Sequence, residues 1–217
     1  MYDYLLFDLD GTLTDPQEGI TKCVQHGLSA LGIQETNQDI LTSFIGPPLE
    51  ESFSGIYQLT PEQTTQAIFH FRERFRTVGL FENHVFDGIP EMLAKLAPYK
   101  KIALATSKPQ VFAIQILEKY GLLPYFDVVV GSNLDGTNTH KHEVIALALK
   151  QLKIPSSQHA SVLMIGDRKY DVDGAKVFDI DCLGVTFGYA RPGELEAANA
   201  KYIVSTVLEL EDFLLNC

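Results

Sequence analysis

Two aspartates stand one residue apart at the end of the first apolar run of the chain. Asp8 and Asp10 follow Tyr4–Phe7, and Gly11 comes directly after them. A short apolar run that ends at a glycine predicts a buried strand followed by a turn. Because side chains alternate along a strand, both carboxylates are expected on one face, where they would repel each other and lose hydration. A bound divalent cation relieves both costs, and magnesium suits a site made of oxygen ligands.

A second pair of carboxylates follows a later apolar run. Asp167 comes after residues 161–165, and Asp171 lies four positions further on, in the turn that opens a helix. Such a pair can approach one cation together with Asp8, directly or through water. Asp173 is the rival to Asp171, although a charge in the first turn of a helix is commonly solvated.

An EF-hand calcium loop is another interpretation of residues 8–11, and the spacing excludes it. Such a loop needs glycine at its sixth position and glutamate at its twelfth. Counted from Asp8, those positions hold Leu13 and Gly19.

Hydroxyl and amino groups follow other parts of the predicted sheet. Thr106 and Ser107 come after the apolar run 101–105 and before a predicted helix, whose start offers hydroxyls and backbone N–H groups to a phosphate. The same two residues could instead cap that helix. Lys141 opens a later helix, and a site with at least three carboxylates needs a cation that offsets charge and holds a phosphoryl oxygen. We expect Thr106, Ser107 and Lys141 to bind phosphate, while the role of Lys108 stays open.

Alternating apolar and amphipathic segments after residue 85 predict the scaffold that positions these groups. The expected strands are 101–105, 127–130, 161–165 and 181–185, and the expected helices are 89–96, 110–120, 141–152, 169–178 and 207–215. Repeated strand–helix units indicate an α/β fold, a Rossmann-like parallel sheet covered on both faces. Ligands collect at the carboxyl ends of such strands, which brings the polar residues to one edge.

Residues 16–80 are expected to be almost entirely helical. The expected helices are 18–31, 37–44, 49–56 and a fourth that begins at Thr60 and ends near Gly79. Thr60, a proline directly after it and Gln63 form a strong helix start. Because this block separates the first strand from the others, we predict an inserted α-helical cap at 16–80 in a core of 1–15 and 81–217.

The overall composition excludes several classes of partner. The 217 residues carry a formal net charge of −11, from 17 basic and 28 acidic side chains. This charge does not suit nucleic acid or anionic membranes, and neither a signal segment nor a run of membrane-spanning length is present. The cysteines Cys23, Cys182 and Cys217 are far apart and fit thiols in a reducing compartment. We expect a cytoplasmic protein, a monomer or weak dimer, that acts on a small molecule.

Together these groups predict phosphoryl transfer through an aspartyl-phosphate. Asp8 attacks phosphorus, and magnesium neutralises the approach of the two anions. Asp10 protonates the leaving alkoxide and then deprotonates the water that hydrolyses the intermediate. The expected substrate is a small phosphate ester.

Four motifs resemble those of the haloacid dehalogenase superfamily of hydrolases, in family order across the whole chain. They are residues 8–12, residues 106–108, Lys141 and residues 166–171. The resemblance implies that Asp8 is the nucleophile, that Asp10 is the acid and base, and that Thr106 and Lys141 contact phosphate. The implied magnesium ligands are Asp8, Asp167, the backbone carbonyl of Asp10 and, as a fourth, Asp171.

The insertion resembles the helical cap of the subgroup that contains phosphoglycolate phosphatases. Residues 46–50 resemble the cap loop that faces the substrate there, which implies substrate contacts for Gly46, Pro47 and Glu50. Residues 188–190 and 200–204 also resemble that subgroup.

The chain departs from the relatives that perform other chemistry. Superfamily dehalogenases lack the second aspartate, present here as Asp10, and phosphonate hydrolases carry alanine there. Sugar phosphomutases usually have histidine where this chain has Ile20, and often valine where it has Thr12. Hydrolysis is therefore favoured over a sugar phosphomutase or phosphotransferase, and over a non-catalytic regulatory protein of the same fold.

The cap loop gives a limited indication of the substrate. It offers Glu50 and Glu51 and no arginine for a substrate carboxylate, which favours sugar or nucleoside phosphates over phosphoglycolate. Lys22, Arg72 and Arg74 are the cap residues that could reverse this preference by reaching inward, although solvated helix faces are their more common place.

Overall fold

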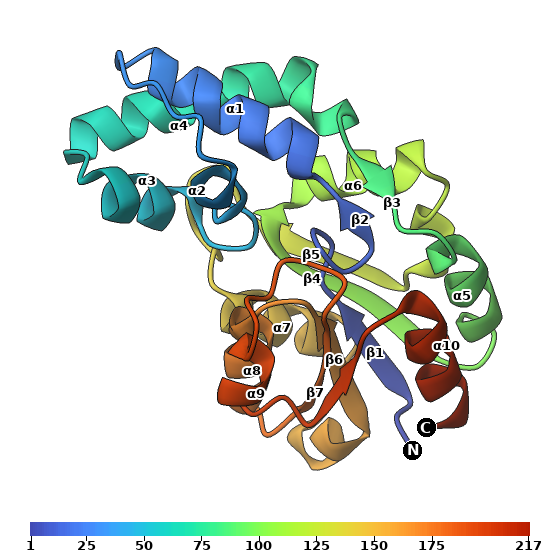
Figure 1. Cartoon of the computed structure of the whole chain (residues 1–217). Helices are drawn as coiled ribbons and strands as arrows, with labels where there is room; N and C mark the ends of the chain where they lie inside the picture. Colours follow the sequence, from blue (N-terminus) through green and yellow to red (C-terminus); the bar gives the residue numbers. More distant parts are fainter. The chain divides into compact units, whose positions relative to one another are not determined.

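Six strands form one sheet in which every neighbouring pair is parallel (Figure 1). The computed structural model describes all 217 residues. The strand order is β5-β4-β1-β6-β7-β8. The strands are β1 (Tyr4–Phe7), β4 (Lys101–Pro109), β5 (Val128–Ser132), β6 (Val162–Gly166), β7 (Asp181–Val185) and β8 (Tyr202–Val204). The chain adds β4 and β5 on one side of β1 and β6 to β8 on the other, so the order reverses beside β1, where such sheets bind ligands.

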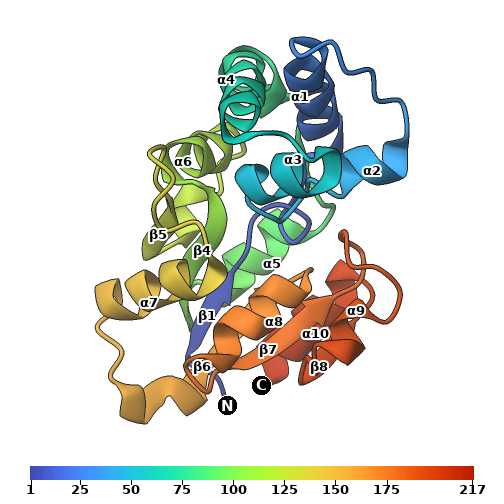
Figure 2. The same cartoon turned by 90° about the vertical axis from the view of Figure 1, so that its left-hand side faces the viewer.

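Helices cover both faces of this sheet (Figures 1 and 2). One face is covered by α7 (Lys141–Gln151), α8 (Lys169–Lys176) and α9 (Glu194–Ala197), and the other by α5 (Ile89–Leu96) and α10 (Val207–Asn216). The helix α6 (Gln110–Lys119) packs against β4 and β5. Short 3-10 turns occur at η2 (Leu123–Tyr125) and η3 (Ser156–Ser161). The predicted α/β fold with a Rossmann-like parallel sheet is confirmed.

Alternation along the strands divides the core into two layers. Leu6, Ala103 and Met164 belong to the buried cluster formed with α7 and α8. Their neighbours Leu5 and Ile165 are also fully buried and point to the opposite face. Burial of each such aliphatic side chain contributes about 1.5–3 kcal/mol, so the central strands are held from both sides. The ends of these strands are therefore fixed points for the residues that follow them.

The strand β4 is longer than predicted. The expected strand ends at Ala105, whereas β4 continues with a register shift to Pro109, which pairs with Ser132 of β5. Ser132 Oγ donates a hydrogen bond to the Ser107 carbonyl oxygen at 2.8 Å. A residue before proline prefers extended backbone, which keeps Lys108 out of α6. Residues 106–108 thus form an irregular strand end and not a helix start.

Four short elements have no signal in the apolar pattern. They are β2 (Thr14–Asp15), β3 (His84–Val85), β8 and α9. Elements of two to four residues contain too few positions to display a period of 2.0 or 3.6. The three residues of β8, Tyr202-Ile203-Val204, are apolar, but a run of three is too short to distinguish a strand from other structure.

Contacts divide the chain into two units, Met1–Asp15 with Val85–Cys217, and Pro16–His84. The second unit holds α1 (Gln17–Ser29), α2 (Gln38–Thr42), α3 (Leu49–Tyr57), α4 (Pro61–Thr77) and the turn η1 (Gly79–Phe81). The strands β2 and β3 pair where the chain passes between the units. The predicted start of α4 is confirmed: Thr60 Oγ1 accepts the Gln63 N–H at 3.3 Å, and Gln63 Oε1 accepts the Thr60 N–H at 3.0 Å.

Within the second unit, α1 and α4 lie side by side, and small residues set their separation (Figure 1). A Cβ added at Gly27 would lie 2.6 Å from the carbonyl oxygen of Ala67. At the other end of α1, a Cβ added at Gly19 would lie 2.2 Å from the carbonyl oxygen of Gly79, in the turn η1 that follows α4. The backbone of α1 can lie this close to α4 and η1 only because residues 19 and 27 have no side chain.

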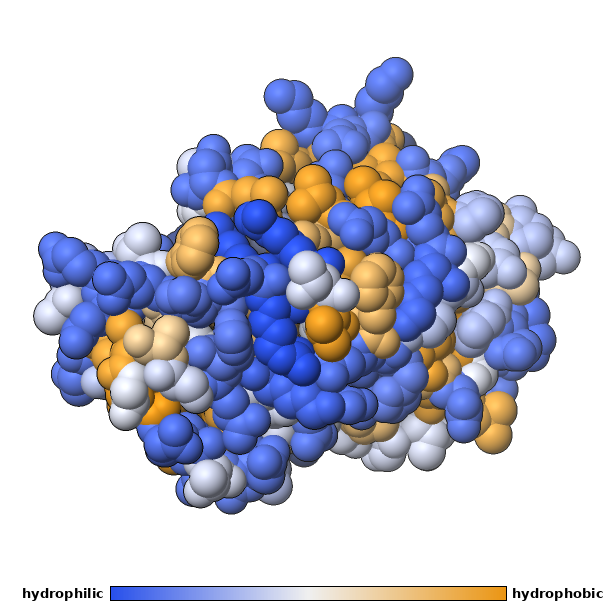
Figure 3. All heavy atoms as spheres, turned by 90° about the horizontal axis from the view of Figure 1, so that it is seen from above, coloured by the Kyte–Doolittle hydropathy of each residue, from blue (hydrophilic) through white to orange (hydrophobic).

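Exposed apolar side chains occur in both units of the protein. Figure 3 shows one face of the molecule, where hydrophobic atoms lie in several groups among hydrophilic ones. Exposed large apolar side chains are scattered, for example Ile56 and Phe69 in the second unit and Tyr99 and Leu208 in the first. Single exposed apolar residues of this kind are ordinary. No helix combines the length and the apolar composition that a membrane-spanning segment needs.

The close approach of α1 and α4 predicts opposite effects for two glycine substitutions. Gly27→Ala should lower the free energy of unfolding by about 1–3 kcal/mol, because the new methyl group meets backbone that cannot turn aside. Gly55→Ala in α3, where a Cβ has nothing within 4 Å, should be neutral or stabilising by up to about 1 kcal/mol. Urea unfolding followed by far-UV circular dichroism measures both. Equal unfolding midpoints for the two variants would contradict the close approach.

Candidate active site

The loop after β1 sets the positions of Asp8 and Asp10. The Asp8 N–H still donates to the Ile165 carbonyl of β6 at 2.9 Å, although β1 ends one residue earlier. The chain then turns, and the Leu9 carbonyl accepts the N–H of Leu13 at 2.9 Å. The two aspartates therefore lie in a hydrogen-bonded loop. The strand alternation used to place them on one face ends before Asp10.

Lys141, the first residue of α7, lies between two of the carboxylates. Its Nζ is 2.8 Å from Asp8 Oδ1 and 2.9 Å from Asp171 Oδ1, and it donates to the Ala105 carbonyl at 3.2 Å. The lysine side chain is only 4% exposed. Burial alone would lower the pKa of Lys141, but the charges of Asp171 and Asp8 raise it overall. The amine is therefore protonated and offsets part of the negative charge around it.

Asp167 completes a cluster of three buried carboxylates. Asp8, Asp167 and Asp171 each offer an oxygen that lies within 4.8 Å of the other two. The Tyr189 N–H donates to Asp167 Oδ2 at 2.7 Å, whereas Asp167 Oδ1 is buried without a hydrogen-bond partner. Burial, followed by the charges of Asp171 and Asp8, raises the pKa of Asp167 well above its usual range. Three carboxylates against Lys141 leave an excess of negative charge that a cation would neutralise.

Asp171 is held by the first turn of α8. Its Oδ2 accepts the Arg168 N–H at 3.1 Å, while its Oδ1 faces Lys141. Burial, opposed by the Lys141 charge, raises the pKa of Asp171 to about 6. The rival Asp173 is exposed on α8. The structure thus brings Asp171, and not Asp173, to the carboxylate cluster.

Two glycines leave room for the cluster. A Cβ at Gly166 would collide with the Asp171 carboxylate, and one at Gly11 would collide with the Asp167 carboxylate. Gly11 also has a φ of +82°, a conformation that favours glycine. The carboxylates therefore occupy space that any other residue at these positions would fill.

Lys108, whose role the sequence leaves open, contacts Asp10. The Lys108 Nζ and Asp10 Oδ2 form a short ion pair, and the lysine side chain is only 6% exposed. Burial raises the pKa of Asp10, and the Lys108 charge opposes this shift without cancelling it. Asp10 is thus a carboxyl group that can hold a proton more readily than an exposed aspartate.

Thr106 and Ser107 follow the regular part of β4. Thr106 is buried, and its Oγ1 accepts the Lys108 N–H at 3.3 Å. No side chain caps α6, whose first flanking residue is Pro109. The interpretation of Thr106 and Ser107 as helix caps is therefore wrong, because the strand continues to Pro109 and α6 begins only at Gln110.

Tyr189 is a residue of the site that sequence reasoning does not assign. Its backbone N–H holds Asp167, and its hydroxyl donates a short hydrogen bond to Asp15 Oδ1. The only signal for it is that residues 188–190 resemble the phosphoglycolate phosphatase subgroup. The sequence also does not indicate the contact between Arg168 and Glu194. Arg168 Nε donates a hydrogen bond to Glu194 Oε1 at 2.9 Å, which joins the start of α8 to α9.

The expected cap-loop residues belong to the second unit. Gly46 has a φ of +108°, Pro47 follows it, and Glu50 lies in the first turn of α3. Of the basic residues of this unit, Arg74 and Lys22 are both paired with Glu82, at 2.7 and 3.0 Å. Lys22 also pairs with Glu18, at 2.5 Å, so the two carboxylates Glu18 and Glu82 offset the charges of Lys22 and Arg74 within the unit.

The fold and the motifs identify the family. The family model of haloacid dehalogenase-like hydrolases matches residues 5–185. The chain belongs to this family, which is the resemblance that its motifs predict.

Similar proteins carry several names, and phosphatases are among them. A 5'-nucleotidase of Pseudomonas aeruginosa is 44% identical over 98% of this chain and 96% of its own length. A tyrosine-protein kinase of Mycobacterium tuberculosis is 35% identical over 97% of this chain and 72% of its own. A phosphoglycolate phosphatase of Colwellia psychrerythraea is 28% identical, with 96% and 95% covered. The crystal structure of a predicted phosphatase from Clostridium acetobutylicum superposes with a TM-score of 0.94, at 46% identity, over 100% of both chains.

The raised pKa of Asp167 predicts that Asp167→Asn stabilises the metal-free protein. An unfolded aspartate has a pKa of about 3.9, so the folded protein loses stability as the pH rises above that value toward the raised folded pKa. Asparagine has no charge to bury and can still accept the Tyr189 N–H. We expect a gain of about 0.5–2 kcal/mol at pH 8 and a smaller one at pH 5.

Thermal unfolding in the presence of a chelator measures this difference. Asp173→Asn is the matched control, since Asp173 is an exposed aspartate of α8. A gain at pH 8 that is equal for the two variants, or no larger than at pH 5, would contradict the assignment of charge repulsion to Asp167.

Proposed function

We propose that this protein is a magnesium-dependent phosphomonoester hydrolase that acts through an aspartyl-phosphate on Asp8. The observation that carries the proposal is the buried carboxylate of Asp8, ion-paired to Lys141 and next to the unpartnered oxygen of Asp167. A nucleophilic carboxylate needs such a partner to approach a phosphate dianion, because the two anions otherwise repel each other. Membership of the family supports the same activity on phosphate esters.

The donor set fits magnesium. Asp8, Asp167 and Asp171 supply only oxygen, at distances from one another that allow a shared cation, and Asp167 Oδ1 has no other partner. Magnesium is bound in proteins by one or two carboxylates together with water and substrate phosphate. We propose that Asp8, Asp167 and the Asp10 carbonyl hold it, with Asp171 acting directly or through water. A bound magnesium ion would supply positive charge beside the phosphoryl oxygens.

Two steps follow from the remaining side chains. In the first, an Asp8 oxygen forms a bond to phosphorus while the bond to the ester oxygen breaks, and Asp10 gives its proton to that oxygen. In the second, Asp10 accepts a proton from water as the water oxygen attacks phosphorus and releases Asp8. Lys141 keeps its charge throughout and offsets that of the transferred phosphoryl group. The raised pKa of Asp10 supports its role as the proton carrier.

Phosphate binding is proposed for the end of β4. The Thr106 hydroxyl lies directly after Ala105, whose carbonyl accepts from Lys141, so both groups are near the end of the same strand. Ser107 would contribute its backbone N–H or hydroxyl. The second unit is proposed to act as a cap that excludes water from the phosphoryl group, with Gly46, Pro47 and Glu50 facing the substrate.

Nucleoside 5′-monophosphates are the first substrates to test. The similar protein from Pseudomonas aeruginosa is named a 5'-nucleotidase, and the acidic residues 50 and 51 of the cap loop disfavour a substrate with an additional carboxylate. A sugar phosphate or phosphoglycolate remains the alternative within the same mechanism.

Transfer of the phosphoryl group to a second molecule is the other candidate activity. It is favoured by one observation, the 35% identity to a protein named a tyrosine-protein kinase. Transfer and hydrolysis share the first step and differ in what attacks phosphorus in the second. Hydrolysis in oxygen-18 water places the label in inorganic phosphate, whereas transfer leaves the phosphoryl group on an acceptor.

The mechanism predicts that Asp8→Asn abolishes phosphate release from p-nitrophenyl phosphate in magnesium buffer. The loss should be at least about a thousandfold, because the amide is not a nucleophile. Asp173→Asn, an exposed aspartate on α8, should retain the activity. A colorimetric assay with circular dichroism of both variants separates chemistry from folding. Unchanged turnover by Asp8→Asn, or full turnover by the wild-type protein with a chelator, would overturn the proposal.

The cap-loop assignment predicts a change in substrate preference for Glu50→Gln. Removal of one negative charge should lower the KM for phosphoglycolate relative to adenosine monophosphate by about two- to fivefold, the effect of a partly screened charge. Glu62→Gln, which removes an exposed charge from α4, is the control. Steady-state kinetics with both substrates measures the ratio of specificity constants. An identical ratio in the two variants would place Glu50 away from the substrate.

A further inference from the structure

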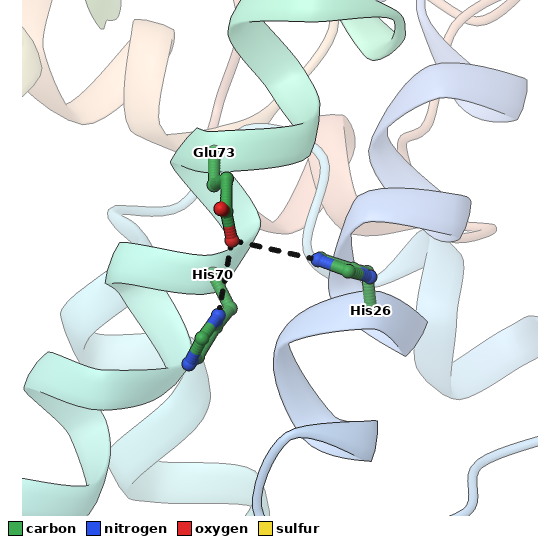
Figure 4. A group of neighbouring side chains, drawn as sticks. All are labelled: His26, His70 and Glu73. Atoms are coloured by element: carbon green, nitrogen blue, oxygen red, sulfur yellow. Dashed lines mark hydrogen bonds and ion pairs between the residues drawn. The ribbon is translucent and has the colours of Figure 1, made fainter.

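Two histidines and a glutamate meet on the surface of the second unit. Figure 4 shows His26 of α1 pointing toward His70 and Glu73 of α4. His70 Nδ1 is 3.2 Å from Glu73 Oε2, and His26 Nε2 is 3.9 Å from the same oxygen. The proposed hydrolysis uses none of these three residues.

The separations of these atoms approach those of metal ligands. Two ligands of a tetrahedral zinc ion with bonds of about 2.0–2.1 Å lie about 3.3 Å apart. One donor atom from each of His26, His70 and Glu73 lies within 4.8 Å of the other two. Small rotations of partly exposed side chains would bring all three atoms to a common centre. Two imidazoles and one carboxylate are also a donor set that zinc uses in proteins.

The helices hold these residues in place before any ion binds. His26 directly precedes Gly27. The backbone of α1 at Gly27 lies so close to α4 that an added Cβ would be 2.6 Å from the carbonyl oxygen of Ala67. Ala67, His70 and Glu73 are spaced three residues apart and so share one side of α4. A close backbone contact between the two helices therefore lies next to the three donor groups and restrains the distance between the helices there.

The site is open to solvent on one side. The side chains of His26, His70 and Glu73 are 47%, 36% and 60% exposed, so an ion can enter and water can complete its coordination. The net charge of −11 attracts cations to the surface in general. Imidazole ligands select transition metals over magnesium and calcium, which prefer oxygen.

We propose that His26, His70 and Glu73 form a binding site for a divalent transition-metal ion of the zinc class, which links α1 to α4. His26 donates the lone pair of Nε2, His70 that of Nδ1, and Glu73 one carboxylate oxygen. The hydrogen bond between His70 and Glu73 is exchanged for two metal bonds, and the proton of the His70 ring then resides on its outer nitrogen. The ion would bridge two helices that are far apart in the sequence, and so stabilise the inserted unit.

Zinc titration of the metal-stripped full-length chain tests the proposal. Isothermal titration calorimetry with zinc chloride, in an excess of magnesium that occupies the all-oxygen cluster of the core, should detect one zinc per chain. His70→Ala and Glu73→Gln should each weaken binding by at least about tenfold, since loss of even an outer partner of a metal ligand costs this much. His142→Ala is the matched control, because His142 is an exposed histidine that does not belong to the group of His26, His70 and Glu73.

Two further measurements separate coordination from a merely structural effect. Cobalt(II), used in place of zinc, should give the intense visible absorption of a four-coordinate ion in the wild-type chain and in His142→Ala, and lose it in His70→Ala. Zinc should also raise the melting temperature of the wild-type chain and not that of His70→Ala. Equal zinc affinity in wild type and His70→Ala would overturn the proposal, as would an equal loss in His142→Ala or a cobalt spectrum that no variant changes.

Discussion

The ammonium group of Lys141 is buried between Asp8 and Asp171, and the arrangement of the core around the carboxylates depends on this contact. A buried charge is costly unless it is paired, so the lysine and the two aspartates must remain together. The same amine donates to the carbonyl of Ala105, so one side chain connects α7 with β4, the loop after β1 and the first turn of α8. The pairing is incomplete, because Asp167 adds a third carboxylate with an unpartnered oxygen. Such local imbalance costs stability, and it is characteristic of places where a protein binds or reacts.

The strand order explains how residues from distant parts of the sequence arrive at one place. β1 lies between β4 and β6, so the segments that follow these three strands are neighbours at one edge of the sheet. The groups at this edge are carboxylates after β1 and β6 and hydroxyl and amino groups in the irregular end of β4. Gly11 and Gly166 then allow the carboxylates to approach more closely than side chains at these positions would permit. The strand order therefore brings these groups to one edge of the sheet, and the two glycines allow the carboxylates to pack closely there.

Much of the fold and of the cluster could be predicted from the sequence, since both follow from local patterns. Apolar runs predict β1 and β6, and the rule that ligands gather at the carboxyl ends of parallel strands links Asp8, Asp167 and Lys141 from the sequence alone. Lys108 and Tyr189 could not be assigned in this way. Lys108 reaches Asp10 because β4 continues irregularly to Pro109, and Tyr189 reaches Asp167 through the path of a loop. Neither path leaves a periodic signal in the residues that form it.

Tyr189 also joins the carboxylate cluster to the segment that leads into the second unit. Its N–H holds Asp167, and its hydroxyl holds Asp15, the last residue of the first unit before the chain enters the inserted helices. The aromatic ring is rigid between these two bonds, so the position of residue 15 and the orientation of the Asp167 carboxylate are not independent. Asp15, where the chain leaves the first unit, and the Asp167 carboxylate are thus both bound by one residue.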